Sequence, residues 1–332
     1  MDTRMLDEYQ KWAMDVEKIL EKDRSWVDRY KKYSDNMIEN SNAFIEARRK
    51  FRVYKPLHAY LTIGKAKDKK IVFDLRYLGQ SVGSIKIKGE EVLLSVDRDQ
   101  SKNNKEYFKC MIGELKDVDW KKSKEAKKFR KYFRDHAQGL PRQIEHMVES
   151  ALFSETGKTQ STNKMLCNIT PVAYANTRIH MKTTLAASDA KNNKISISNN
   201  GGEIDLLCRR SIKSGRGESR LVVIEIKDEN DKGESFDLAM KQAISYAVFI
   251  KELIYSEAGD NWMKLWGMKN QKKSGFIIDC AVAMPKGITK PGYGKDRIEL
   301  INREGNKDYI ELHYLELIDI TSENVKFDHS FL

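Results

Sequence analysis

The chain alternates between segments with a helical spacing of apolar residues and segments with strand-like patterns. Apolar residues recur every three to four positions among dense charges over residues 1–50, which predicts one or two amphipathic helices. From Ala59 to about Met111 the pattern changes to short apolar runs separated by Gly, Lys and Asp, which predicts a β-rich unit. Residues 117–139 then read as a strongly basic helix that ends at Gly139.

A second series of elements follows Gly139. The pattern predicts helices over 141–153 and 236–256, and strands or extended segments over 165–174, 177–185, 201–209, 220–227, 275–285 and 309–319. This order is typical of a mixed sheet flanked by helices. We therefore predict an α/β protein with two domains. A separate N-terminal helix-plus-β module, residues 1–138, could bind nucleic acid or a partner, and the second domain comprises residues 139–332.

Length and charge narrow the classes of protein. A chain of 332 residues is long enough for two domains, and a net charge of +11 favours a polyanionic partner, nucleic acid before membrane. No run of about 18 apolar residues occurs, and residues 1–12 lack a secretory pattern, so we expect a soluble, cytoplasmic protein. The four cysteines are far apart and form no CxxC motif, which indicates reduced thiols and argues against zinc.

The apolar strand LVVIEIK, residues 221–227, contains two charges on one face. With a two-residue period, Glu225 and Lys227 share a side with Leu221 and Val223. Burying a carboxylate and an ammonium costs several kcal/mol each unless they are paired or bound to a metal. Asp205, on the preceding strand, could bring a second carboxylate to Glu225, which predicts a site for a divalent cation.

A Mg²⁺ ion prefers hard oxygen ligands and can promote hydrolysis of a phosphodiester. Asp205 and Glu225 would supply carboxylates, and the carbonyl of Ile226 could be a further ligand. Lys227 would lie close enough to hold the attacking water or the scissile phosphate.

Asp205, a gap of about twenty residues, and Glu225-Ile226-Lys227 at the end of an apolar strand resemble the motif of the PD-(D/E)XK nuclease superfamily. The similarity extends in element order over roughly residues 140–318. The residue before Asp205 is Ile204, where the family motif has proline. The resemblance implies a restriction-endonuclease-like fold, with a mixed β-sheet flanked by helices.

The family resemblance also implies supporting residues on two helices. A helix before the first core strand often supplies another acid in this family, and Glu145 and Glu149 are the candidates, with Glu149 preferred. Members similar to RecB nuclease domains add a Gln-x-x-x-Tyr motif after the lysine strand, which Gln242 and Tyr246 match.

The function implied by the resemblance is Mg²⁺-dependent cleavage of nucleic acid, with Mn²⁺ as a substitute ion. DNA is favoured over RNA as the substrate, and the context implied is bacterial defence or restriction. Asp205 and Glu225 would bind the metal, Lys227 would position water, and Glu149 or Glu145 would assist.

Other interpretations of the same residues are open. Glu225 and Lys227 could form an ion pair at a strand end, Asp205 could cap a turn, and Tyr246 could be a core residue. The protein could then be a nucleic-acid-binding or interaction protein without catalysis. The basic helix over 117–139 could hold a DNA backbone or be a solvated connector. A homo-oligomer or a partner protein is compatible with either reading.

Overall fold

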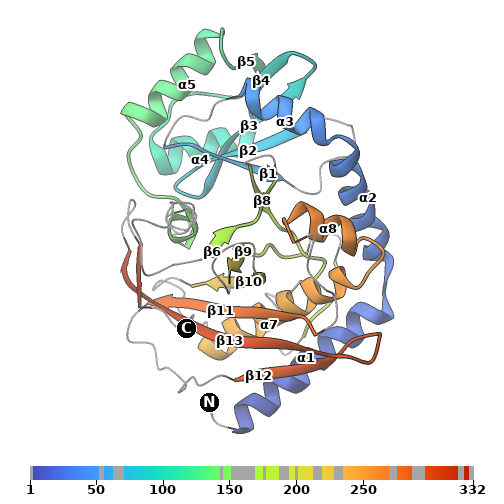
Figure 1. Ribbon diagram of the computed structural model, residues 1–332. Helices are drawn as coiled ribbons and strands as arrows, with labels where there is room; N and C mark the ends of the chain where they lie inside the picture. Colours follow the sequence, from blue (N-terminus) through green and yellow to red (C-terminus); the bar gives the residue numbers. More distant parts are fainter. Residues whose placement is uncertain are drawn as a thin grey trace.

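The computed structural model describes most of the chain in thirteen segments. These are residues 3–51, 56–62, 71–142, 145–150, 169–174, 177–186, 194–198, 201–211, 219–227, 235–268, 275–285, 296–320 and 325–328. They form a mixed α/β structure with two sheets of seven strands each (Figure 1). No helix in these segments is long and apolar enough to cross a membrane.

The first sheet is built mainly from the N-terminal half of the chain. Its strand order is β5-β4-β3-β2-β1-β8-β7. The strands are β1 (His58–Thr62), β2 (Ile71–Tyr77), β3 (Gln80–Lys88), β4 (Glu91–Val96), β5 (Leu115–Asp119), β7 (Ala173–Tyr174) and β8 (Thr177–His180). The first five form an antiparallel meander, whereas β8 joins β1 in parallel.

Two helices accompany the meander, and both differ from the sequence prediction. α4 (Arg98–Phe108) occupies part of the region predicted as β. Asp97 and Gln100 form a capping box at its start, a signal that is present in the sequence. α5 (Lys124–Asp135) is shorter than the predicted basic helix, because residues 115–119 pair with β4 as a strand and Ser123 caps the helix.

The second sheet has the strand order β12-β13-β11-β10-β9-β6, with β14 paired to β13. Its strands are β6 (Ile169–Pro171), β9 (Leu206–Ser211), β10 (Ser219–Ile226), β11 (Ile277–Pro285), β12 (Arg297–Ile301), β13 (Lys307–Ile320) and β14 (Val325–Asp328). Strands β6, β9 and β10 are antiparallel neighbours, and β10, β11 and β13 run parallel. The long helix α7 (Phe236–Ile254) connects β10 to β11, as a parallel crossover requires.

The predicted alternation along β10 is confirmed. Leu221 and Val223 belong to the large core cluster that includes α7, whereas Val222, Ile224 and Ile226 belong to a second cluster on the other face. The sequence prediction did not include β12, β14 or the short helix α8 (Gly259–Leu265). Part of the predicted helix over 141–153 is observed, at residues 145–150, and residues 151–153 lie outside the described segments.

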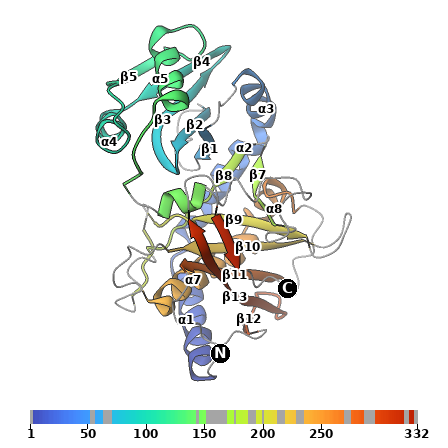
Figure 2. The ribbon, with the colours of Figure 1, turned by 90° about the vertical axis from the view of Figure 1, so that its left-hand side faces the viewer.

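The N-terminal helices α1 (Thr3–Lys22), α2 (Ser25–Glu39) and α3 (Ser41–Lys50) extend along one side of the molecule (Figures 1 and 2). The indole nitrogen of Trp12 on α1 donates to the carbonyl of Lys241 on α7 at 3.0 Å, and that of Trp262 on α8 donates to the carbonyl of Tyr30 at 3.2 Å. These contacts, and the pairing of β8 with β1, cross the predicted boundary at 138/139. The domain division stays a prediction.

Candidate metal centre

Three carboxylates converge at the end of β10. Asp205 immediately precedes β9, and the antiparallel pair Leu206–Ile224 places it beside Glu225. One oxygen of each, together with one of Glu145 from the helical segment 145–150, lies within 4.8 Å of the others. The amide of Ile226 donates to Asp205 Oδ2 at 2.8 Å, which fixes the direction of that carboxylate.

Lys227 completes this group. Its Nζ lies 2.9 Å from Glu225 Oε1 and 3.8 Å from Glu145 Oε1. Its backbone amide donates to the carbonyl of Ala283 at 2.9 Å, so β11 holds the strand end in place. Glu225 and Lys227 are 1% and 5% exposed, which confirms that both charges of the LVVIEIK strand are buried.

The electrostatics of the group favour a cation. Burial raises the pKa of Asp205 well above its ordinary value, and the charge of Glu225 raises it further, against the opposing effects of Lys227 and the Ile226 amide. Two carboxylates about 5 Å apart repel by about 3 kcal/mol at an effective dielectric constant of 20. Three carboxylates beside one ammonium leave an excess of negative charge. Their oxygens are the hard donors that Mg²⁺ and Mn²⁺ prefer.

Gln242 and Tyr246 lie on the face of α7 turned toward this centre. Gln242 Nε2 donates to the Tyr246 hydroxyl at 3.1 Å, and both side chains are buried. Burial and the charge of Glu225 raise the pKa of Tyr246, so its hydroxyl keeps its proton. A Cβ at Gly202 would lie 2.4 Å from that hydroxyl, so the glycine allows the chain before β9 to pass against the tyrosine.

Glu149, the preferred helix acid, has a different set of neighbours. Its Oε1 lies 3.4 Å from Arg76 Nη1 of β2 and 3.9 Å from His180 Nε2 of β8, and its Oε2 lies 3.6 Å from His146 Nδ1. Burial would raise the pKa of Glu149, but Arg76 and the two histidines outweigh it, and the pKa is lowered from 4.5. The structure thus brings Glu145 into the carboxylate group and holds Glu149 beside it, next to Arg76 and the two histidines.

Arg76 links the first sheet to the helical segment 145–150. Its Nε lies 2.8 Å from Asp74 Oδ2 and its Nη2 lies 3.3 Å from His180 Nδ1. Its guanidinium group stacks over the Tyr60 ring at 4.8 Å. Asp74 and Arg76 alternate within an apolar strand as Glu225 and Lys227 do, a signal that sequence reasoning missed.

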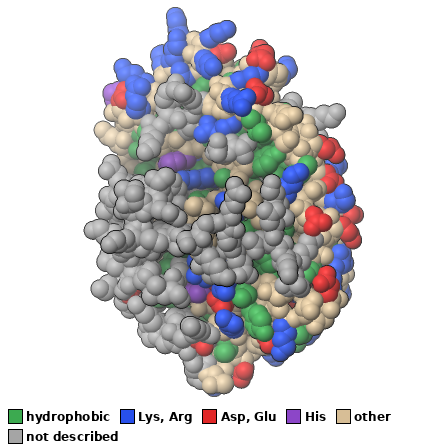
Figure 3. Space-filling view, viewed as in Figure 1, with side chains coloured by type: hydrophobic (Ala, Val, Ile, Leu, Met, Phe, Trp, Pro, Cys, Tyr) green, Lys and Arg blue, Asp and Glu red, His purple; other side chains and the backbone are tan. Residues whose placement is uncertain are grey.

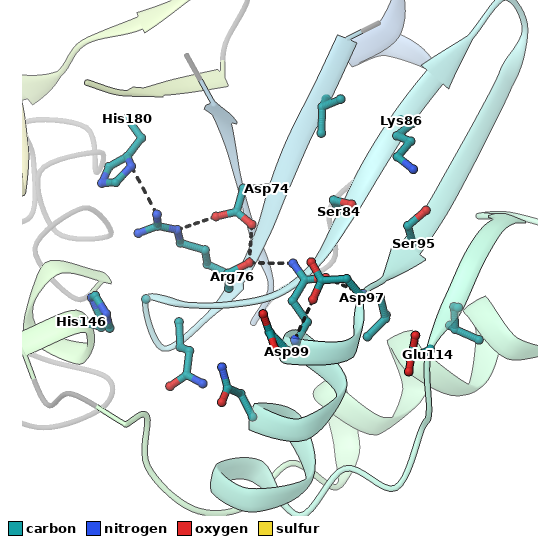
Figure 4. Close-up of a pocket in the computed structure, with 18 of the residues that line it drawn as sticks. Asp74, Arg76, Ser84, Lys86, Ser95, Asp97, Asp99, Glu114, His146 and His180 are labelled. Atoms are coloured by element: carbon teal, nitrogen blue, oxygen red, sulfur yellow. Dashed lines mark hydrogen bonds and ion pairs between the residues drawn. The ribbon is translucent and has the colours of Figure 1, made fainter. Parts of the chain in front are cut away.

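A cavity of about 880 Å³ opens on the far side of Arg76 (Figure 4). One end is lined by Arg76, His146 and His180, and the other by the start of α4 and the outer part of β3 and β4. The lining contains five Lys or Arg residues and five Asp or Glu residues, and it is therefore nearly balanced in charge. A polyanion would gain little from such a lining.

A second cluster with metal-ligand residue types has its charges satisfied by arginines. Asp279, Glu311 and His313 have ligand atoms within 4.8 Å of one another. Arg210 lies 2.7 Å from Asp279, and Glu311 lies between Arg220 at 2.5 Å and Arg297 at 2.6 Å. These cations occupy the carboxylate oxygens, so the cluster is an ion network between strands and not a metal centre.

The chain was compared with protein-family models, curated proteins and solved structures. None of them matches it. The assignment of a function therefore depends on the geometry of the candidate metal centre. The role of each predicted site residue, including the carbonyl of Ile226 as a ligand, stays a prediction.

Proposed function

We propose that the protein is a Mg²⁺-dependent nuclease that hydrolyses phosphodiester bonds, most economically in DNA and in a defence or restriction context. The observation that carries the proposal is the meeting of the half-buried Glu145 and Asp205 with the buried Glu225 and Lys227. A structural ion pair would need one carboxylate for one ammonium. The surplus of two carboxylates is costly without a cation.

Asp205, Glu225 and Glu145 would hold the Mg²⁺ ion, with Mn²⁺ as a substitute. The ion would supply charge neutralisation at the phosphate and a more acidic water. Lys227 would orient the water or a phosphate oxygen, because its ammonium is fixed by Glu225 at 2.9 Å. Glu149 would act on the site through its charge, which contributes to the raised pKa of Asp205. Gln242 and Tyr246 would support the position of Glu225.

The arrangement of elements agrees with a restriction-endonuclease-like core. A helical segment at 145–150 comes first, then the antiparallel strands β6, β9 and β10, then α7 and the parallel strand β11. The carboxylates stand at the junction of β9 and β10, where the family motif would place them. This finer fold assignment is part of the proposal.

Cleavage of supercoiled plasmid DNA in Mg²⁺ tests the proposal. We expect cleavage by the wild type, loss of at least about 100-fold in Lys227→Ala and Glu225→Gln, and no loss in Lys264→Ala, an exposed lysine of α8. Circular dichroism checks that each variant folds. An absence of cleavage by the folded wild type over a Mg²⁺ and Mn²⁺ titration would overturn the nuclease assignment for DNA.

Two further experiments test whether the substrate is RNA and which helix acid binds the metal. Labelled RNA offered beside DNA identifies a ribonuclease that uses the same centre. Mn²⁺ binding by Glu145→Gln and Glu149→Gln identifies the helix acid: we expect the Glu145 variant to lose more affinity, because only Glu145 lies in the carboxylate group. Retained nucleic-acid binding without Mn²⁺ binding would support a non-catalytic binding protein.

A further inference from the structure

The outer face of α5 carries a row of lysines, and the acidic residues of this helix lie only at its ends, Glu125 in the first turn and Asp135 as the last residue. Lys124, Lys127, Lys128 and Lys131 are spaced i, i+3, i+4 and i+7, so they form one stripe along the helix. All four are exposed, and none makes an ion pair with a described residue. We call these four residues the lysine stripe. Lys121 and Lys122, also exposed, extend it before the helix begins.

The opposite face of α5 fixes this orientation. Ala126, Phe129 and Phe133 are fully buried, and Phe129 packs against the first sheet near Gly83. The hydroxyl of Tyr132 donates to the carbonyl of Phe108 at 2.7 Å, and the guanidinium group of Arg130 lies over the Trp120 ring. The aromatics are therefore used for packing, and the stripe is held rigidly outward.

The stripe carries an unfavourable interaction within the helix. Like charges at i,i+3 and i,i+4 repel, and the four lysines make four such pairs. Glu125 and Asp135, at i,i+3 from Lys128 and i,i+4 from Lys131, offset only part of this repulsion, because neither forms an ion pair with a stripe lysine. A bound polyanion would convert the repulsion into attraction.

We propose that the lysine stripe is a docking surface for the phosphate backbone of nucleic acid. From Lys124 to Lys131 the helix advances about 10 Å, which matches about three phosphates of one strand at a rise of about 3.4 Å each along the duplex axis. A membrane surface fits less well, because interfacial helices bury an apolar face and the apolar face of α5 is already covered by the first sheet.

The position of α5 suits a substrate that also reaches the metal centre. Figure 2 shows α5 and, below it, the green helical segment 145–150 on the side that faces the viewer. Figure 3 shows many Lys and Arg side chains, with some Asp and Glu side chains among them, at the top of the molecule, where α5 and β5 lie in Figure 1. The cavity between them is balanced in charge, so the backbone contacts belong on α5.

Binding of labelled duplex DNA in EDTA at several salt concentrations tests this surface without cleavage. We compare the wild type with a stripe variant, in which all four lysines become Gln. A control variant carries Lys11→Gln, Lys22→Gln, Lys32→Gln and Lys264→Gln. These control lysines are exposed on α1, α2 and α8, away from α5, and their replacement changes the net charge equally (Figure 1).

We expect the stripe variant to bind roughly tenfold or more weakly in 50 mM salt, and the slope of log affinity against log salt to fall by roughly 3 to 4. The stripe variant should also melt at a higher temperature, because the repulsion is gone. An unchanged slope, or an equal loss in the control variant, would overturn the docking surface. So would a wild type that ignores DNA but binds anionic phosphatidylserine vesicles.

The docking surface takes its partner from the proposed function, but its test does not depend on catalysis. A wild type that binds DNA through the stripe and never cleaves it would retain this inference and remove the nuclease assignment. If the wild type cleaves DNA and the stripe variant binds DNA equally well, the nuclease assignment stands and the docking surface is wrong.

Discussion

Replacement of Arg76 by Met tests the link between the first sheet and the candidate metal centre. Methionine is close in length, so it fills much of the space while it removes the guanidinium group. Glu149, which is 3% exposed, would then lose its nearest permanent cation. At the observed 3.4 Å and an effective dielectric constant of 20, the lost attraction is about 5 kcal/mol.

The net loss should be slightly smaller, about 3–5 kcal/mol, because some water can reach an uncompensated buried charge. Urea denaturation at pH 7 measures it as a shift of the midpoint at constant slope. A double variant with Glu149→Gln removes the stranded carboxylate as well. It should recover part of the loss, so the two substitutions should be coupled by more than about 1 kcal/mol.

The pH dependence gives an independent check. In the wild type the pKa of Glu149 in the folded state is below 4.5, so its contribution to stability is present above that pH and is lost as pH falls through the folded pKa. Without Arg76, burial should raise this pKa instead, and the variant should lose stability as pH rises from about 4.5. The difference in unfolding free energy between the wild type and the Arg76→Met variant should thus widen from pH 4.5 to pH 7. A loss below about 1 kcal/mol at pH 7 with no coupling would refute this reasoning.

Three other substitutions have defined outcomes. Asp205→Asn should melt at a higher temperature than the wild type at pH 8 in EDTA. The pKa of Asp205 is raised in the folded state, so the ionised carboxylate is destabilising above pH 3.8. The variant should also lose the rise in melting temperature that Mn²⁺ causes in the wild type. A lower melting temperature in EDTA would contradict this. Gly202→Ala should cost about 1–3 kcal/mol by denaturation and lower Mn²⁺ affinity, since its Cβ displaces the Tyr246 hydroxyl; unchanged stability would contradict the close contact. Phe129→Ala should cost about 3–5 kcal/mol, whereas Lys128→Ala should be nearly neutral.

The parts of the site that lie close in sequence could be predicted, because strand periodicity is strict. The two-residue period of β10 is enough to place Glu225 and Lys227 on one buried face, and a hairpin connection brings Asp205 beside Glu225. Strand periodicity does not indicate which of Glu145 and Glu149 joins Asp205 and Glu225. Both lie on one face of the helix, and only the approach of that helix to β10 decides which carboxylate reaches the candidate metal centre.

Contacts between distant segments escaped prediction. Arg76 meets Glu149 across 73 positions, and His180 enters from a third segment. Patterns within one segment of the sequence do not indicate contacts between side chains of distant segments. α4 is a different case. Asp97 and Gln100 form a capping box that indicates its start, but the apolar strand before it leads the sequence prediction to extend the β-rich unit through this helix. The apolar residues of α4 are Tyr107 and Phe108, both at its end, so the helix shows no helical spacing of apolar residues.

The parallel pairing of β8 with β1 has a consequence for biogenesis. During synthesis, β1 acquires its second neighbour only after residue 180 has left the ribosome, more than a hundred residues after β1 itself. Until then its backbone amides and carbonyls form an open edge that can recruit strands from other nascent chains. Recombinant fragments that stop at residue 138 would retain that edge permanently, so they should precipitate more readily than the full chain.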